Sequence, residues 1–199
     1  MNLSRSLYRH ADLRRLIEPQ VVAVVGASAK AGSFGQRTLA NLQRYSGRVY
    51  GVNPKHAGDL NGVPCFPSVR ELPEAPDCVV LAVGGEFVPS VLEECAERGS
   101  GGAIVYASGF AEVGAPEGLA TQQRIGEIGR ASGMRILGPN CLGLINTRIG
   151  AGLHFVPSFP EMELIPGPVS LVSQAGGFGY GLMQGMKRGI GIGHFLSAG

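Results

Sequence analysis

Residues 21–35 constrain the fold most strongly, because an uninterrupted apolar run there ends abruptly in glycines. Residues 21–25 read VVAVV, which is typical of a strand buried on both faces, and residues 26–35 follow as GASAKAGSFG. Glycines permit positive φ and close approach to a ligand, and a helix that follows such a turn directs unpaired N–H groups at an anion. This stretch therefore predicts a phosphate-binding turn and a nucleotide binder.

Strand and helix patterns alternate along the rest of the first 145 residues. Further apolar strands are predicted at residues 48–53, 78–83, 103–107 and 135–137, and amphipathic helices at residues 36–45, 88–98 and 119–132. Continuously apolar strands that alternate with helices imply a parallel sheet covered on both faces. Residues 1–145 are thus predicted to form a Rossmann-like, doubly wound α/β domain. Its ligand would bind beyond the carboxyl ends of the strands, where the winding reverses.

The C-terminal part of the chain repeats this pattern only briefly. Residues 146–168 contain four prolines, at positions 157, 160, 166 and 168, and predict a proline-rich linker. A strand at residues 169–173, a glycine turn, a helix at 178–188 and a strand at 193–198 then follow. Two strands and one helix leave apolar faces and an unpaired edge, so residues 169–199 are expected to be the beginning of a second, incomplete α/β domain.

Composition excludes several classes of partner and site. The net charge of +2 provides no basic stripe for a nucleic-acid backbone. No apolar run approaches 18 residues and the N-terminus has no signal-peptide core, so we expect a soluble, cytoplasmic protein without membrane contact. The 4 cysteines form no CxxC pair and have no histidine at metal-ligand spacing, so no metal site is expected.

The residues after the second predicted strand discriminate between nucleotides. An NAD site places Asp or Glu there to accept hydrogen bonds from the ribose hydroxyls, whereas this chain has Asn53-Pro54-Lys55. A carboxylate would repel a ribose phosphate, while an amide and an ammonium group would attract one. The candidates are therefore ligands with a phosphorylated ribose, namely NADP or coenzyme A (CoA).

Motifs in a fixed order carry a family resemblance. They are VAVVGAS at residues 22–28, VYGVNPK at 49–55, SGFAE at 108–112 and RILGPNCLG at 135–143. Together they resemble the CoA-binding domain of the NDP-forming acyl-CoA synthetases of the ADP-forming acetate–CoA ligase type, which are relatives of the succinyl-CoA synthetase alpha subunit. The resemblance continues through residues 171–176 and 195–199. It implies that residues 169–199 begin a flavodoxin-like, succinyl-CoA-synthetase-like domain.

The resemblance implies CoA as the ligand, with contacts spread along the strand ends. The glycine-rich turn would face the CoA phosphates, Lys55 would pair with a phosphate near the adenosine, and Pro139 and Asn140 would lie towards the thiol. The cofactor-binding residues so predicted are Gly26, Ser28, Gly32, Ser33, Gly35, Asn53, Lys55, Val83, Ser108, Gly109, Phe110, Glu112, Pro139 and Asn140. Ser173, Gln174 and Gly176 would begin a helix whose N-terminus holds the phosphate during transfer.

The resemblance also implies a reaction and a partner. Acyl-CoA, phosphate and NDP would interconvert with acid, CoA and NTP through an acyl phosphate and a phosphohistidine, and an ATP-grasp domain or subunit would bind the nucleotide. The family's histidine lies downstream of the last predicted strand, and His194 falls inside that strand, so His194 is not its equivalent. Residues 1–199 alone are therefore not expected to be competent for catalysis. Ala175 also stands where relatives often have serine.

Other functions stay open on the sequence alone. A non-catalytic CoA-binding or CoA-sensing module would use the same motifs and would need a partner chain to complete its second domain. An NADP-dependent oxidoreductase shares the phosphate-attracting second strand, but no acid or tyrosine–lysine pair is placed to assist hydride transfer. These residues do not specify the carboxylic acid, and apolar surface on the unfinished domain leaves a homo-oligomer open.

Overall fold

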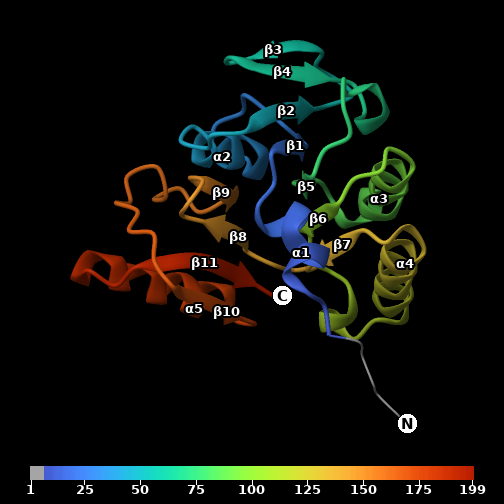
Figure 1. The fold of residues 1–199 in the computed structure, drawn as a ribbon. Helices are drawn as coiled ribbons and strands as arrows, with labels where there is room; N and C mark the ends of the chain where they lie inside the picture. Colours follow the sequence, from blue (N-terminus) through green and yellow to red (C-terminus); the bar gives the residue numbers. More distant parts are fainter. Residues whose placement is uncertain (1–6) are drawn as a thin grey trace.

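The computed structural model describes residues 7–199 and contains a 7-stranded and a 4-stranded sheet (Figure 1). No helix among these residues is long and apolar enough to cross a membrane. The elements in chain order are α1 (His10–Ile17), β1 (Val21–Val25), α2 (Phe34–Asn41), β2 (Arg48–Val52), β3 (Gly58–Leu60), β4 (Val63–Phe66), η1 (Val69–Glu71), β5 (Cys78–Leu81), η2 (Gly85–Phe87), α3 (Val88–Glu97), β6 (Gly102–Val105), η3 (Ala111–Val113), α4 (Pro116–Ser132), β7 (Arg135–Leu137), β8 (Gly143–Asn146), β9 (Ala151–His154), β10 (Val169–Ser173), α5 (Gly176–Leu182), η4 (Met183–Arg188) and β11 (Ile192–Ser197).

The first sheet is wound in both directions from its centre. Its strand order is β3-β4-β2-β1-β5-β6-β7, and β1 pairs in parallel with β2 on one side and with β5 on the other. The chain runs outward through β2 and β4 and then returns past β1 to β5, β6 and β7. This reversal at β1 confirms the predicted Rossmann-like, doubly wound parallel sheet.

Alternate residues of β1 feed two separate cores, as the period of two in a strand requires. Val22 and Val24 pack with residues of α1, α2, β8 and β9, whereas Ala23 and Val25 pack with residues of α3 and α4. Figure 1 accordingly shows α3 and α4 together on one side of the sheet and α2 on the other. Burial of each valine side chain stabilises the fold by about 1.5–3 kcal/mol. The layers therefore hold the carboxyl ends of the central strands firmly in place.

A hairpin that the sequence analysis missed lies at the outer edge of this sheet. β3 and β4 pair antiparallel, with Asp59 opposite Pro64, and β4 continues the sheet by pairing in parallel with β2. Only Leu60 and Cys65 of these strands are buried. Because so few of their residues are apolar and buried, residues 58–66 lack the continuous apolar run that marked the other strands.

The second sheet joins segments from before and after the predicted linker. Its order is β10-β11-β8-β9, in which β11 pairs in parallel with β10 and antiparallel with β8. β9 lies within residues 146–168, so the segment expected as a linker contains a buried strand. β11 is therefore an interior strand, and β10 is the exposed edge of the sheet, where Val172 is 73% exposed.

Candidate nucleotide-binding site

The glycine-rich turn after β1 has a geometry that only glycine satisfies at its two ends. Gly26 has φ of +85°, and its N–H donates to the carbonyl of Val52 at 2.9 Å. A Cβ on Gly26 would collide with the carbonyl oxygen of Ala82, and a Cβ on Gly35 would collide with that of Gly26. Because Gly26 and Gly35 have no side chain, β1, the loop after β5 and the start of α2 can approach one another closely.

Polar side chains hold the turn in shape at the start of α2. Ser33 is the N-cap, and its Oγ accepts a hydrogen bond from the N–H of Gln36 at 3.2 Å. The Gln36 side chain accepts from the N–H of Gly32, and Ser28 Oγ accepts from the N–H of Lys30 at 3.0 Å. The hydroxyls of Ser28 and Ser33 act here as acceptors, so each keeps a hydrogen to donate to a ligand.

Cations surround this turn without acidic partners. None of the three cations Lys30, Arg37 and Lys55 forms an ion pair within residues 7–199. A Cβ on Gly32 would lie 3.8 Å from the Arg37 guanidinium, which places Arg37 beside the turn. Sequence reasoning missed Arg37. The sequence feature that could have identified Arg37 is a positive charge near the start of a helix. The helix macrodipole disfavours a cation there, and a bound anion would compensate both the Arg37 charge and the positive end of the dipole.

Asn53 and Lys55 follow β2 at the neighbouring strand end, and their roles differ. The Asn53 amide nitrogen donates to the carbonyl of Ala27 at 2.8 Å, and its Oδ1 accepts from the N–H of Lys55 at 2.9 Å. The Asn53 side chain therefore ties the loop after β2 to the glycine-rich turn. Lys55 is exposed beside it and is the group at this loop that can pair with a phosphate.

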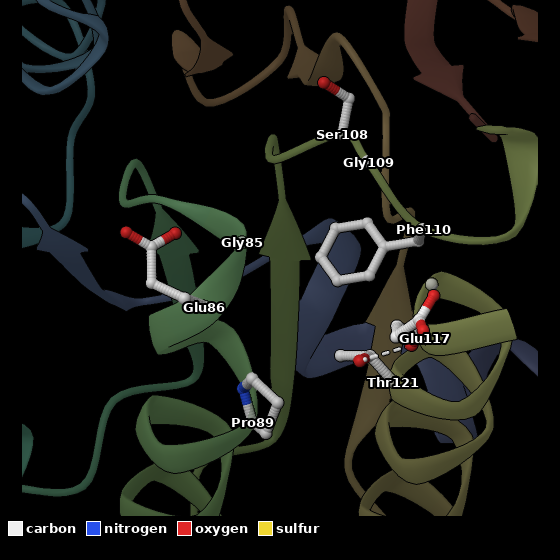
Figure 2. A pocket seen from close by; sticks show the side chains of 9 residues that line it. Gly85, Glu86, Pro89, Ser108, Gly109, Phe110, Glu117 and Thr121 are labelled. Atoms are coloured by element: carbon white, nitrogen blue, oxygen red, sulfur yellow. Dashed lines mark hydrogen bonds between the residues drawn. The ribbon is translucent and has the colours of Figure 1, made fainter. Parts of the chain in front are cut away.

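A hollow of about 380 Å³ opens between the ends of β5 and β6 (Figure 2). Three predicted residues, Ser108, Gly109 and Phe110, lie on one side, and the rest of the lining is Gly85, Glu86, Pro89, Glu117, Gly118 and Thr121. Figure 2 shows Glu86 on η2 and Glu117 on α4 across the hollow from each other. The Glu86 carboxylate is turned away from the hollow and lies beside Gly84. Because no cation is present in its lining, the hollow does not suit a phosphate.

Glu112 organises the loop after β6. Its carboxylate accepts hydrogen bonds from the N–H groups of Gly109 and Phe110, the latter at 3.1 Å. Desolvation alone would raise the pKa of Glu112, but these backbone donors outweigh it and hold the pKa below its usual range. Glu112 thus stays ionised and fixes Gly109, whose φ is +98°, at the rim of the hollow.

A smaller cavity of about 160 Å³ lies where the two sheets meet. It brings together Pro139 and Asn140, which the sequence analysis placed towards the thiol of CoA, Gln174 of the second glycine turn, and Glu112, which was predicted to bind the cofactor. A Cβ on Gly176 would lie 2.9 Å from both Leu142 Cβ and Ser197 Oγ, so the start of α5 packs tightly here. Ser173 is instead turned to its own loop, where Oγ donates to the carbonyl of Ala175.

The predicted residues therefore share one edge of the fold but divide into three places. Gly26–Gly35, Asn53, Lys55 and Val83 gather at the glycine-rich turn, where Val83 Cγ1 would touch a Cβ on Gly26. Ser108–Phe110 line the larger hollow, and Glu112, Pro139 and Asn140 line the smaller cavity. The arrangement offers an anion site at one end and a polar junction at the other, which suits an elongated phosphorylated ligand.

Comparisons with known proteins identify a family for this chain. The CoA binding domain family matches residues 20–147. The ADP-forming acetate–CoA ligase I of Archaeoglobus fulgidus is 38% identical over 188 residues, which are 94% of this chain and 27% of that protein. The alpha subunit of the ADP-forming acetate–CoA ligase I of Pyrococcus furiosus is 40% identical over 177 residues, 86% of this chain and 37% of the subunit.

A solved structure is similar over nearly the same extent. The dinucleotide forming acetyl-coenzyme A synthetase 1 of Ca. Korarchaeum cryptofilum, in complex with phosphate and ADP, matches with a TM-score of 0.85 and 34% identity. The match covers 94% of this chain and 39% of that structure. The chain thus spans between 27% and 39% of the length of these three proteins.

Proposed function

This chain belongs to the CoA binding domain family, and we propose that it is the CoA-binding portion of an NDP-forming acid:CoA ligase. The observation that carries the proposal is the anion site at the end of β1. There the glycine-rich turn and the start of α2 meet Lys30, Arg37 and Lys55, which have no acidic partners among residues 7–199. CoA is an elongated ligand whose phosphates lie at one end and whose reactive thiol lies at the other.

In the proposed complex, CoA lies across the carboxyl ends of the strands. The turn from Gly26 to Gly35 and the N–H groups at the start of α2 receive the pyrophosphate, and Lys55 pairs with the ribose phosphate. The pantetheine arm passes the ends of β5 and β6 and carries the thiol towards Pro139 and Asn140. The lining of the larger hollow supports this direction, because it contains no cation that could pair with a phosphate placed there.

The proposed reaction forms acyl-CoA, phosphate and NDP from acid, CoA and NTP, and it is reversible. This chain would bind CoA and orient its thiol, while the phosphohistidine lies outside residues 1–199. The environment of His154 supports that assignment: its Nδ1 accepts from the N–H of Val156, and burial lowers its pKa to about 3. His154 is fully buried and one of its ring nitrogens is hydrogen-bonded, so it is not accessible to a phosphoryl donor in this structure.

A partner with an ATP-grasp fold would supply the nucleotide site. The open side of the second sheet supports the presence of further protein, because Val172 on β10 and Phe178 on α5 are 73% and 70% exposed. Exposed apolar side chains on an edge strand and its covering helix favour contact with another polypeptide. The partner could be a further domain or a separate subunit.

Calorimetric titration with CoA, dephospho-CoA and NADPH at one salt concentration tests the proposal. CoA is expected to bind, and dephospho-CoA is expected to bind about tenfold more weakly because one charge-assisted contact is lost. Binding of NADPH without CoA would contradict the proposal and favour an oxidoreductase. CoA binding with no ligase activity after addition of an ATP-grasp partner would instead favour a sensing module.

A further inference from the structure

A cavity of about 400 Å³ lies where α1, the last turns of α4, β7 and β11 meet (Figure 1). Its apolar lining is mostly leucine and isoleucine, including Leu16 and Ile17 of α1, Ile136 and Leu137 of β7, and Leu196 of β11. None of its lining residues belongs to the set proposed above to bind CoA. Its volume falls in the range of small-molecule sites, about 300–1,000 Å³, so it can hold a ligand with an aliphatic body.

Two glycines of α4 keep this cavity open. Gly126 and Gly129 both line it. A Cβ on Gly129 would lie 3.0 Å from Ile136 Cδ1, so this glycine lets α4 pack closely on β7. A Cβ on Gly126 would have only guanidinium atoms of Arg130 as its three nearest neighbours, with Nη1 at 3.1 Å. The Arg130 guanidinium therefore lies back along the helix over Gly126, at the cavity.

Two cations at this cavity have no acidic partner. Neither Arg130 nor Arg135 forms an ion pair within residues 7–199. Neutral groups hold Arg135 instead: its Cζ lies 4.2 Å from the centroid of the Tyr8 ring, and its Nε donates to the backbone carbonyl of Asp12 at 3.3 Å. The Asp12 carboxylate accepts from the N–H of Arg9 and does not pair with Arg135. An apolar cavity with two unpaired guanidinium groups suits a ligand that has an apolar chain and one anionic end.

We propose that this cavity is a binding site for a medium-chain carboxylate, whose carboxylate pairs with Arg130 and Arg135 while its alkyl chain lies against α1, β7 and Leu196. This second site is independent of the proposed binding of CoA. A carboxylate matches the planar fork of a guanidinium group, and the burial of each methylene raises the affinity about fourfold. Because Leu196 belongs to the second sheet and Ile136 to the first, the bound chain would contact both sheets.

Calorimetric titration of the whole chain with butanoate, hexanoate, octanoate and octanol tests this site. Affinity is expected to rise about fourfold for each added methylene from butanoate to octanoate. Octanol has no charge and should bind about fivefold more weakly than octanoate, and Arg130→Gln should weaken octanoate by a similar factor. Arg124→Gln is the matched control on the same helix, because Arg124 pairs with Glu93 and does not line the cavity. It should leave octanoate binding unchanged.

A second variant, Gly126→Leu, fills the cavity. Leucine favours a helix more than glycine does, and the atoms nearest to this position belong to the flexible Arg130 side chain, so the variant should fold. Its urea unfolding midpoint should be no lower than that of wild type. Octanoate binding should be lost.

Saturable octanoate binding that depends on chain length, weakens in Arg130→Gln, is lost in Gly126→Leu and persists in excess CoA would support this site. Absence of octanoate binding, equal binding of octanol, or full binding to Gly126→Leu would overturn it. Competition by CoA would also overturn it, because octanoate would then occupy the CoA site. Sedimentation that shows a wild-type dimer and a Gly126→Leu monomer would overturn it as well, and would assign the cavity to a second copy of this chain.

Discussion

β1 and β10 are both strands of five residues in parallel ladders, but they differ sharply in burial. Every residue of β1 is buried, because β2 and β5 flank it and helices cover both faces of its sheet. β10 pairs only with β11, and most of its residues are exposed. Pairing alone does not complete a parallel sheet; its faces must also be covered.

The difference separates two roles within the chain. The first sheet carries its own cores, so it can fix Gly26, Ser33 and Lys55 in position for a ligand before the ligand arrives. The second sheet brings Gln174 and Gly176 to the junction but leaves its outer side open. Ligand binding is thus expected to depend on the first sheet, and partner binding on the second.

The largest expected effect is on the free energy of unfolding, and it is tested by substituting one leucine on a helix that covers each sheet. Leu92 on α3 is fully buried, whereas Leu182 on α5 is 47% exposed. Leu92→Ala should lower the free energy of unfolding by about 2–5 kcal/mol, because it leaves a cavity. Leu182→Ala should change it by less than about 0.5 kcal/mol. Urea unfolding of both variants measures the difference, and equal losses would show that the second sheet is as fully packed as the first.

Lys55 tests whether ligand affinity belongs to the first sheet. Lys55→Ala should weaken CoA binding by about 1.5–3 kcal/mol, roughly tenfold or more, because a charge-assisted contact to phosphate is lost. Lys187→Ala on η4 is the matched control and should leave the affinity unchanged. Calorimetry reports both values. Unchanged affinity in Lys55→Ala would remove this residue from the site.

Glu112 gives the smallest effect and a dependence on pH. Desolvation raises the folded-state pKa of Glu112, but the N–H donors of Gly109 and Phe110 outweigh it and lower the pKa. The ionised carboxylate therefore stabilises the fold at pH values above the pKa of the unfolded state. That contribution should disappear as pH falls through the folded pKa, and solvent screening keeps it small. Urea unfolding should show Glu112→Gln less stable than wild type at pH 7, with the difference shrinking as the pH falls through the folded-state pKa. A difference that persists at low pH would contradict this origin.

The central strands and the glycine-rich turn could be predicted because local sequence specifies them. The run from Val21 to Val25 is apolar at every position, and Gly26 and Gly35 mark the turn that follows. The hairpin of β3 and β4 could not be predicted in this way, because it gains its stability by pairing with β2 and not from an apolar run of its own.

The parts of the site that escaped prediction depend on contacts between distant segments. Asn53 was predicted to attract a ribose phosphate, a role that stays a prediction, while the structure adds its hydrogen bond to Ala27. Arg37 is the exception, because its contact with Gly32 is local and the positive charge near the start of a helix was its signal.

Hydrogen exchange of the backbone amides with and without CoA tests the central claim most directly, namely that the complete first sheet holds the CoA phosphates at the end of β1. Addition of CoA is expected to slow exchange at residues 26–37 and 53–55, where the glycine-rich turn and Lys55 lie, and to leave exchange in β10 unchanged. Protection confined to β10 and α5, or no protection at residues 26–37 when CoA is bound, would contradict it.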